Sequence, residues 1–373
     1  MRGIVWLLSL FFLAHLGLSA ALVEVRGNEA LAKALSELKP KTTLRIHAGD
    51  YRGGWSVAGI DQLIVTGADP KNPPHFKGGG QAWHFSKCNQ LQVRHLKVSG
   101  QKHNGFNIDD GGDFKQPARQ VLLEHLEISD IGPRGNFDGI KCSGLEELTI
   151  RHCIVSGWGG QAIDFVGCHQ AVISHCRIIG KPGYSQATGP QFKGGCSDVT
   201  IEHCTLINAG MRPIQAGGST GMAYFRPPGA KYEARNITIR HNAIVGGTCA
   251  VAFTGVDGAE FSRNTVVRPD KWVMRILQET TAPEFPPCRK VGFHHNIIVF
   301  ERSKVRGVAN IGPNTAAQTF LFHHNLWHAL DRPDRSKPNL PSPEKSGLYG
   351  VDPKLDSKTW LPANARARDL LAK

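Results

Sequence analysis

The stretch QFKGGCSDVTIEHCTLINAGMRPIQAGGSTGMAYFR, residues 191–226, decides the fold of this chain. Within it, VTIEHCTLI alternates apolar and polar residues with a period of two, which is typical of a strand that buries one face. Glycines close both ends of this segment, where turns need freedom in φ, at Gly194, Gly195, Gly210, Gly217 and Gly218. The stretch therefore predicts a strand between two turns.

The same pattern returns along the chain, and its clearest marker is the residue that follows the histidine in TIEHC. This marker position recurs at intervals of 22 to 38 residues, at Leu96, Leu126, Cys153, Cys176, Cys204, Asn242, Asn264, Asn296 and Asn325. The short intervals fit one coil of a β-solenoid, and the longer ones fit the same coil with a loop insertion. The sequence predicts a stack of such coils.

Cysteine and asparagine dominate the marker column, and both are expected to point inward. The chain has nine cysteines, and an odd number excludes complete pairing. We expect buried free thiols that behave as small apolar groups, with one disulfide as the alternative. Stacked asparagines at a turn are expected to hydrogen-bond along the solenoid axis.

A histidine stripe lies one residue before the marker column and is expected to point outward. It comprises His95, His125, His152, His175, His203, His241, His295 and His324, with Arg263 as the interruption. Successive rings should lie about one strand spacing apart, roughly 4.8 Å. A stack of neutral imidazoles without a catalytic role is the simpler interpretation. Metal binding or protonation in mild acid is the alternative.

Residues 1–21 have the composition of a secretory signal peptide: a basic residue, an apolar run and then small residues. Residues 22–373 are expected to form one domain, with an N-terminal cap at about 22–50 and an irregular C-terminal cap at about 328–373. The N-terminal cap would contain a helix that follows Asn28 as its N-cap. We expect a secreted or periplasmic monomer without a transmembrane segment.

The net charge of +13 and the pI of about 9.4 arise without any long basic run. A dispersed positive field on an exported protein indicates an anionic partner. An acidic polysaccharide is favoured over nucleic acid, because the sequence has no aromatic stacking motif of the kind that nucleic-acid modules use.

The order of segments from the N-terminus resembles a known superfamily. A helix, TLRIHAGDY, LIVTG, LQVRHLKVSG and NGFNIDDGG, with the ending YGVDPKLDSKTWLPANARARDLL, are similar to the pectin-lyase-like right-handed parallel β-helices. The resemblance implies an all-β, right-handed parallel β-helix with an N-terminal capping helix. The superfamily includes lyases, hydrolases, epimerases and adhesins that do not catalyse, so the fold alone does not assign a reaction.

A charged row is predicted about half a coil before the markers. Lys141, Asp164 and Lys193 lie 12, 12 and 11 residues before their markers, and an apolar residue that should point inward precedes each. These charges are therefore expected outside, side by side on neighbouring coils, with Gln215 and Arg275 continuing the row. The alternative is an exposed salt-bridge ladder that contributes little to stability.

Further basic residues flank this row, and loops at about 181–189 and 217–234 are expected to wall a groove. Arg212 precedes the Gln215 strand, and Arg226 follows a glycine-rich turn. Cations of this kind can neutralise a uronate carboxylate while the proton beside it is removed. We therefore predict Lys193 and Arg212 as catalytic residues. The predicted substrate-binding residues are Lys141, Asp164, Gln215, Arg226 and Arg275.

Lys193, followed by a strand and an arginine one coil later, resembles the chondroitinase and alginate-lyase group of β-helix lyases. That resemblance implies a lysine base, an assisting arginine and calcium as the cofactor that neutralises the carboxylate. Oxygen ligands for calcium could come from Asp109, Asp110 and Asp113 in IDDGGD. A polar turn is the alternative for this acidic segment.

Two other functions stay open. NFDGIK and QAIDF resemble the polygalacturonase arrangement of aspartates on neighbouring coils, which would make Asp138 and Asp164 the acid and base of a hydrolase. A secreted β-helix that binds glycans or a cell surface through its basic face, without catalysis, needs only the charge and the fold.

Overall fold

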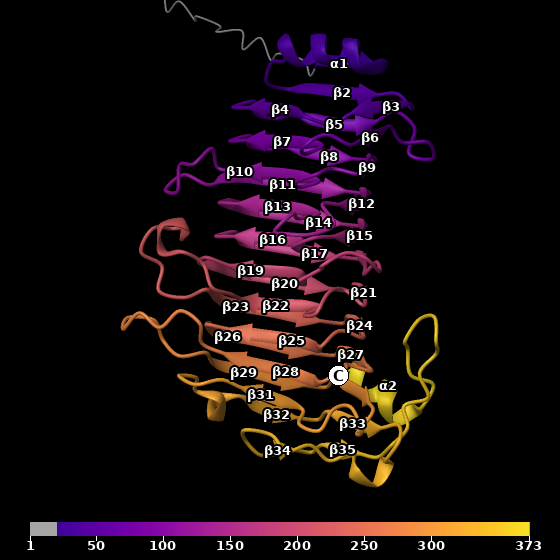
Figure 1. Cartoon of the computed structure of the whole chain (residues 1–373), viewed down its shortest axis with the longest axis vertical. Helices are drawn as coiled ribbons and strands as arrows, with labels where there is room; N and C mark the ends of the chain where they lie inside the picture. The colour runs from indigo at the N-terminus through magenta and orange to yellow at the C-terminus, as the bar shows by residue number, and fades with distance from the viewer. Residues whose placement is uncertain (1–20, 373) are drawn as a thin grey trace, which may run out of the picture.

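The computed structural model describes residues 21–372, which wind into a right-handed parallel β-helix with three long sheets (Figure 1). Each complete coil contributes one strand to each of the three sheets, which follow one another along the chain in the order C, A and B. Every pairing between neighbouring named strands is parallel, as a solenoid of this kind requires. The predicted all-β solenoid is confirmed.

Sheet A has 13 strands and carries the residues just before the marker column. Its strands are β1 (Ala21–Val25), β2 (Thr42–Ile46), β5 (Ile64–Gly67), β8 (Gln92–Arg94), β11 (Ala118–Glu124), β14 (Leu145–Arg151), β17 (His169–Ser174), β20 (Cys196–Glu202), β23 (Ala234–Arg240), β26 (Val256–Ser262), β29 (Arg289–His294), β32 (Leu321–His323) and β34 (Glu344–Lys345).

Sheet B has 12 short strands that follow the marker column. Its strands are β3 (Asp50–Arg52), β6 (His75–Lys77), β9 (Lys97–Ser99), β12 (Glu127–Ile131), β15 (Ile154–Trp158), β18 (Arg177–Ile179), β21 (Thr205–Ile207), β24 (Ala243–Val245), β27 (Thr265–Val267), β30 (Ile297–Phe300), β33 (Leu326–Ala329) and β35 (Leu348–Tyr349).

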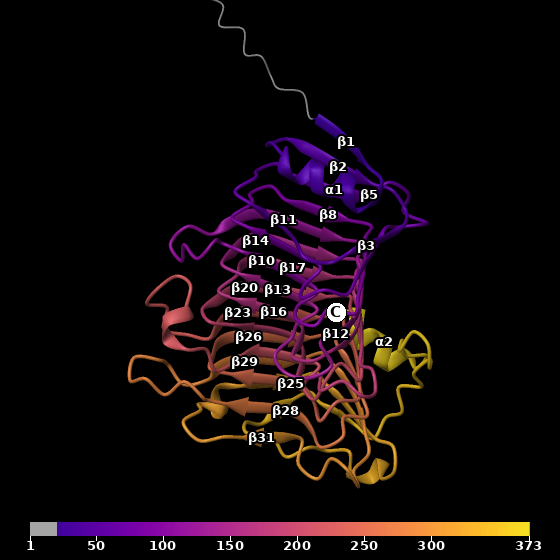
Figure 2. The same ribbon diagram turned by 45° about the horizontal axis from the view of Figure 1, so that its top comes forward.

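Sheet C has 10 strands and contains the predicted charged row. Its strands are β4 (Trp55–Ala58), β7 (Trp83–Ser86), β10 (Phe106–Asp109), β13 (Ile140–Ser143), β16 (Gln161–Val166), β19 (Thr188–Lys193), β22 (Ile214–Gly217), β25 (Cys249–Thr254), β28 (Trp272–Leu277) and β31 (Ala309–Ile311). Longer loops leave the ends of several of these strands, as Figure 2 shows for the segments between sheets C and A.

The core lies between the three sheets and is filled by the side chains that alternate inward. On sheet C these include Ile140, Ile163 and Phe165, all fully buried. The rings of Phe165 and Phe192, on adjacent coils, lie 5.6 Å apart. Burying each such side chain contributes roughly 1.5 to 3 kcal/mol, so the stacked coils, rather than any single strand, hold the fold together.

The turn from sheet A to sheet B explains the histidine stripe. Each stripe residue has left-handed backbone geometry, with φ from 51° to 55°, and Arg263 shares it at 55°. Among residues with a side chain, histidine and asparagine enter this region more readily than most. From His95 to His241 the successive ring centroids lie 4.9 to 5.2 Å apart, which confirms the outward stack.

The marker column points inward, as predicted. All nine cysteines of the chain are buried and free. In the later coils an asparagine ladder forms: Asn264 Oδ1 accepts from the backbone N–H of Asn242 at 3.0 Å, and Asn296 Oδ1 accepts from that of Asn264 at 2.9 Å. Each side chain thus satisfies a backbone donor in the turn of the preceding coil.

Helix α1 (Gly27–Ser36) lies at the N-terminal end of the stack (Figure 1), and its Leu31 is fully buried. The prediction that Asn28 caps this helix is wrong. The helix already begins at Gly27, and Asn28 Oδ1 instead accepts from the backbone N–H of Arg52 at 2.9 Å. This contact joins the helix to strand β3.

The C-terminal segment folds back onto the outside of sheet B. Helix α2 (Ala365–Ala372) buries Ala367 and Leu370 against Ile297 and Leu326. Short 3-10 helices are η1 (Met222–Tyr224), η2 (Ala317–Thr319) and η3 (Pro333–Arg335).

The predicted signal peptide lies outside the described residues except for Ala21, which begins β1 and pairs with Thr42. Within residues 21–372, neither helix has the length and apolar character that crossing a membrane would require.

Candidate functional site

The outer face of sheet C carries a row of polar residues in register on successive strands. Lys141 on β13 pairs with Asp164 on β16, which pairs with Gln191 on β19 and then Gln215 on β22. Ala252 follows on β25, and Arg275 on β28 comes after it. The structure therefore brings four of the predicted site residues into one row: Lys141, Asp164, Gln215 and Arg275.

Lys193 does not occupy the row position that its spacing predicted. Its backbone is in register with Val166, two residues beyond Asp164. The turn after β19 contains Gly194 and Gly195, where the preceding coil has only Gly167, and this accounts for one residue of the offset. The other arises because Lys193 lies 11 residues before its marker, whereas Asp164 lies 12 before its own.

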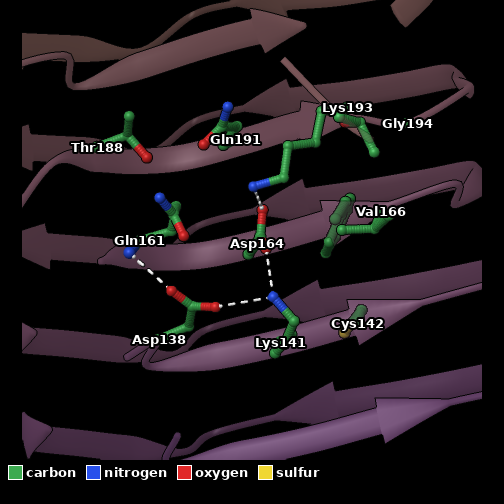
Figure 3. Close-up of polar contacts among 12 residues, drawn as sticks. Asp138, Lys141, Cys142, Gln161, Asp164, Val166, Thr188, Gln191, Lys193 and Gly194 are labelled. Carbon is green, nitrogen blue, oxygen red and sulfur yellow. Dashed lines mark hydrogen bonds and ion pairs between the residues drawn. The ribbon is translucent and has the colours of Figure 1, made fainter. Parts of the chain in front are cut away.

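The Lys193 side chain nevertheless returns to the row (Figure 3). Its Nζ lies 2.9 Å from Oδ1 of Asp164, and Lys141 Nζ donates to the other oxygen, Oδ2, at 2.7 Å. Two ammonium groups from different coils thus converge on one carboxylate.

The expectation that Asp164 is exposed is wrong: its side chain has no exposed surface. It points away from the core, but Lys141 and Lys193 cover it, and these keep 25% and 16% of their side chains exposed. The solvent-facing groups of this cluster are therefore the two lysines.

Asp138, on the turn before β13, completes the cluster. Its side chain is also fully buried; Oδ1 accepts from the backbone N–H of Gln161 at 2.8 Å, and Lys141 Nζ donates to Oδ2 at 3.2 Å. We name Asp138, Lys141, Asp164 and Lys193 the lysine–aspartate cluster.

Asp138, Asp164 and Lys141 differ in how the cluster shifts their pKa values. Burial and the charge of Asp164 raise the pKa of Asp138 to about 6. Burial acts in the same direction on Asp164, but the charges of Lys193 and Lys141 outweigh it and lower the Asp164 pKa. Burial opposes the ammonium form of Lys141, yet Asp164 and Asp138 together raise its pKa. Asp164 is the ionised member of the aspartate pair over the widest pH range.

Two residues that sequence reasoning missed position the Lys193 end of the strand. Glu233, fully buried, accepts from the backbone N–H of Gly194 at 2.9 Å and from that of Thr220 at 2.7 Å. Gly218 leaves room for Lys193, since a Cβ there would lie 3.2 Å from two Lys193 carbons. No sequence motif identifies Glu233, because its partner Gly194 lies 39 residues away along the chain.

Arg212 lies away from Lys193. It bridges to Thr188, at the opposite end of β19. Lys193 is the fifth residue after Thr188, which corresponds to about 16 Å along a strand. Burial lowers the pKa of Arg212, and its Nε has no hydrogen-bond partner among the described residues.

The other predicted binding residues are held in different ways. Arg275 donates from Nε to Asn310 Oδ1 at 2.9 Å. Gln215 is only 2% exposed, and its Oε1 has no hydrogen-bond partner within residues 21–372.

Arg226 lies outside the row, in an ion pair with Asp110. Its Nε donates to Asp110 Oδ2 at 2.5 Å, and its guanidinium lies 3.8 Å from the centre of the Phe114 ring. With 8% of its surface exposed, Arg226 fixes the loop 218–233 against the β10–β11 loop. Of the predicted binding residues, Arg226 is the one that lies outside the row on sheet C.

Two of the three residues suggested for calcium, Asp109 and Asp110, are already engaged. Asp109 accepts from Ser86 Oγ at 2.7 Å and lies 2.6 Å from His84 Nε2, while Asp110 holds Arg226. In the lysine–aspartate cluster the lysine ammonium groups occupy the positions beside the carboxylates that a cation would take. Neither donor set fits a calcium cage as it stands, and calcium as a cofactor stays a prediction.

Comparisons with known proteins agree with this architecture. The family model described as "right handed beta helix region" matches residues 83–266. No curated protein matches the chain by sequence.

Three solved structures illustrate the range of proteins with this fold. An alginate lyase from Paenibacillus sp. is 18% identical, with a TM-score of 0.50, 82% of this chain covered and 99% of that one. The A-module of the mannuronan C-5 epimerase AlgE6 from Azotobacter vinelandii is 13% identical, with a TM-score of 0.52 and 86% and 92% covered. The surface protein and adhesin PfbA from Streptococcus pneumoniae is 11% identical, with a TM-score of 0.53 and 88% and 94% covered. At these identities the likeness is one of fold. The chain has the right-handed parallel β-helix fold that these three structures share.

Proposed function

We propose that this protein acts on an acidic polysaccharide and cleaves it by β-elimination on the outer face of sheet C. The observation that carries the proposal is the convergence of Lys141 and Lys193 on Asp164, which leaves the two lysine side chains as the partly exposed members of the cluster. The net charge of +13 favours an anionic polymer as the partner. The same fold serves an alginate lyase.

The reaction needs a base and a cation close together. The base removes the proton from the carbon beside the uronate carboxylate, a carbon–carbon double bond forms, and the bond to the glycosidic oxygen breaks. That oxygen leaves with a proton from solvent. Lys141, held by two carboxylates, stays an ammonium group and can stabilise the negative charge that develops on the uronate.

Lys193 is the residue to which we assign the proton transfer. It makes one ion pair, with Asp164, whereas Lys141 contacts both aspartates. A lysine accepts a proton only as the neutral amine, so the ion pair must open and the ammonium must lose its proton first.

Hydrolysis by Asp138 and Asp164 is the second candidate, and one observation favours it. The pKa of Asp138 is raised to about 6 and that of Asp164 is lowered, which is the separation expected of an acid and its partner base. Against it, both carboxylates are fully buried and Lys141 lies between them, so a sugar and a water have no direct access. Elimination by the two partly exposed lysines fits the geometry better.

The first test is product analysis with the purified protein and a panel of alginate, pectate, chondroitin sulfate and heparin-like chains. β-Elimination gives an unsaturated uronate, which is followed by its ultraviolet absorbance. New reducing ends without that absorbance would indicate hydrolysis and overturn the proposal. Repeating the assay with calcium and with a chelator tests whether a metal contributes.

A further inference from the structure

The last coils of the solenoid carry a histidine doublet that the other coils lack. His294-His295 and His323-His324 each precede a marker asparagine, within the repeated sequence FHHN. His294 ends β29 and His323 ends β32, and the two residues are in register on adjacent strands. The doublets therefore place two columns of imidazoles next to each other, where the rest of the stripe has one.

Three of these rings bring their nitrogens together. His294 Nδ1 lies 2.9 Å from His295 Nδ1, and the rings of His294 and His323 stack with centroids 4.5 Å apart. One nitrogen from each of His294, His295 and His323 lies within 4.8 Å of the other two. All three residues keep part of their surface exposed, so an ion from solvent can reach them.

We propose that His294, His295 and His323 bind a divalent transition-metal ion of the zinc, nickel and copper class. Imidazole nitrogen is a preferred ligand for these ions, and three histidines with one open position for water form a complete site. A metal–nitrogen distance of about 2.1 Å requires nitrogens roughly 3 to 3.5 Å apart. The contact between His294 and His295 is already close to this, and side-chain rotation of His323 can supply the rest.

The surroundings leave the imidazoles neutral, which is the form that binds metal. Burial and the neighbouring histidines lower the pKa of His295 to about 4. Burial also lowers the pKa values of His294 and His323. Glu260 Oε1, 3.7 Å from His294 Nε2, contributes negative charge. The positive charges nearby are those of Arg263 and Lys345.

The position of this histidine trio suggests what a bound ion does. The trio lies at the turn from sheet A to sheet B, the corner of the solenoid opposite sheet C. Its members come from two successive coils, so an ion would join these coils near the C-terminal end. The expected effect is stabilisation of the folded state by mass action. This inference does not depend on the polysaccharide activity proposed above.

The test is calorimetric titration of zinc(II) into the full chain without a histidine tag, after treatment with a chelator. We expect one ion per chain with a micromolar dissociation constant. His294→Ala and His323→Ala should each weaken binding by about tenfold or more. His152→Ala is the matched control, because His152 stacks at 5.0 Å on both neighbours in the single stripe, and its affinity should match the wild type.

Thermal unfolding with and without zinc gives the second measurement. Zinc should raise the melting temperature of the wild type and of His152→Ala, but not that of His294→Ala. No zinc binding by the wild type would overturn the inference. So would wild-type affinity in both His294→Ala and His323→Ala, or a loss of binding in His152→Ala, which would make the ion a ligand of the whole stripe.

Discussion

Lys193 lies two residues beyond the register position of Asp164, and its ammonium nitrogen still reaches Asp164 Oδ1 at 2.9 Å. Because the side chain runs back along the face of sheet C, the two ends of Lys193 belong to different positions of the row (Figure 3). The Gly194 turn, held by Glu233, fixes the backbone end, and Asp164 fixes the ammonium end. The lysine is therefore held at both ends, and 16% of its side chain is exposed.

Replacing this lysine should abolish the chemistry while leaving the fold intact. For Lys193→Ala we expect the cleavage rate to fall by about 10² to 10⁴-fold, the usual contribution of a positioned proton-transfer group. The assay is the formation of unsaturated product, with circular dichroism as the check on folding. Lys231→Ala is the control, because Lys231 is an exposed lysine that pairs with Glu284 on a loop. Equal rates in the two variants would remove Lys193 from the mechanism.

Asp164 should matter more for stability than Asp138. Asp164→Asn leaves Lys141 and Lys193 without their shared counter-charge, and breaking a buried pair in this way costs about 3 kcal/mol or more. Asp138→Asn should cost less, because Asp138 is the more readily protonated carboxyl and an amide can keep the contact with the Gln161 N–H. Urea denaturation of both variants measures the difference. A larger loss in Asp138→Asn would contradict this ranking.

The raised pKa of Asp138 predicts a pH dependence of stability with a definite sign. The folded state holds this proton up to about pH 6, whereas an unfolded aspartate releases it near about 4. The folded state thus binds more protons in that window, and the free energy of unfolding falls as pH rises through it, by at most about 1.4 kcal/mol per unit. Asp164, with its lowered pKa, has the opposite sign and loses its contribution only on further acidification.

Urea denaturation of the wild type and of Asp138→Asn at several pH values between about 4 and about 6 measures how the free energy of unfolding depends on pH. The free energy of unfolding of the wild type, minus that of Asp138→Asn, should fall as the pH rises through this window. Parallel curves would show that Asp138 does not titrate in this window.

The asparagine ladder supplies a prediction with an internal control. Asn264→Ala removes the acceptor of the Asn242 N–H and the donor to the Ile239 carbonyl, so we expect a loss of about 2 to 4 kcal/mol from unsatisfied buried groups. Asn264→Cys should be milder, because cysteine fills the same column in earlier coils, where Cys204 Sγ lies 3.4 Å from the Cys176 N–H as its acceptor. Equal losses for the two variants in urea denaturation would mean that packing, not hydrogen bonding, decides this position.

The fold was predictable because one local conformation repeats. From His95 to His324, each coil turns from sheet A to sheet B through a residue with left-handed backbone geometry, and histidine occupies this position in all of these coils but one, where Arg263 stands. The inward direction of the marker and the outward direction of the histidine follow from strand alternation alone. Positions far from the marker were less certain, because a single added glycine, as at Gly194-Gly195, shifts the count.

The sequence predicted which types of residue form the site, but not how their side chains are arranged. Residue spacing placed Lys141 and Asp164 correctly on adjacent strands, but it could not show that two lysines would cover Asp164 completely. Nor could it pair Arg226 with Asp110, since 116 residues separate them and the contact depends on how two loops meet. Glu233 could not be predicted for the same reason, because its partner Gly194 lies 39 residues away in the sequence.

The most direct measurement of the central claim is mass spectrometry of the products formed from an acidic polysaccharide in water enriched in heavy oxygen. The account predicts unsaturated oligosaccharides that carry no solvent oxygen at the cleaved bond, and no products with Lys193→Ala. Saturated products that contain the heavy oxygen, lost in Asp138→Asn but retained in Lys193→Ala, would contradict the account and establish hydrolysis by the buried aspartates.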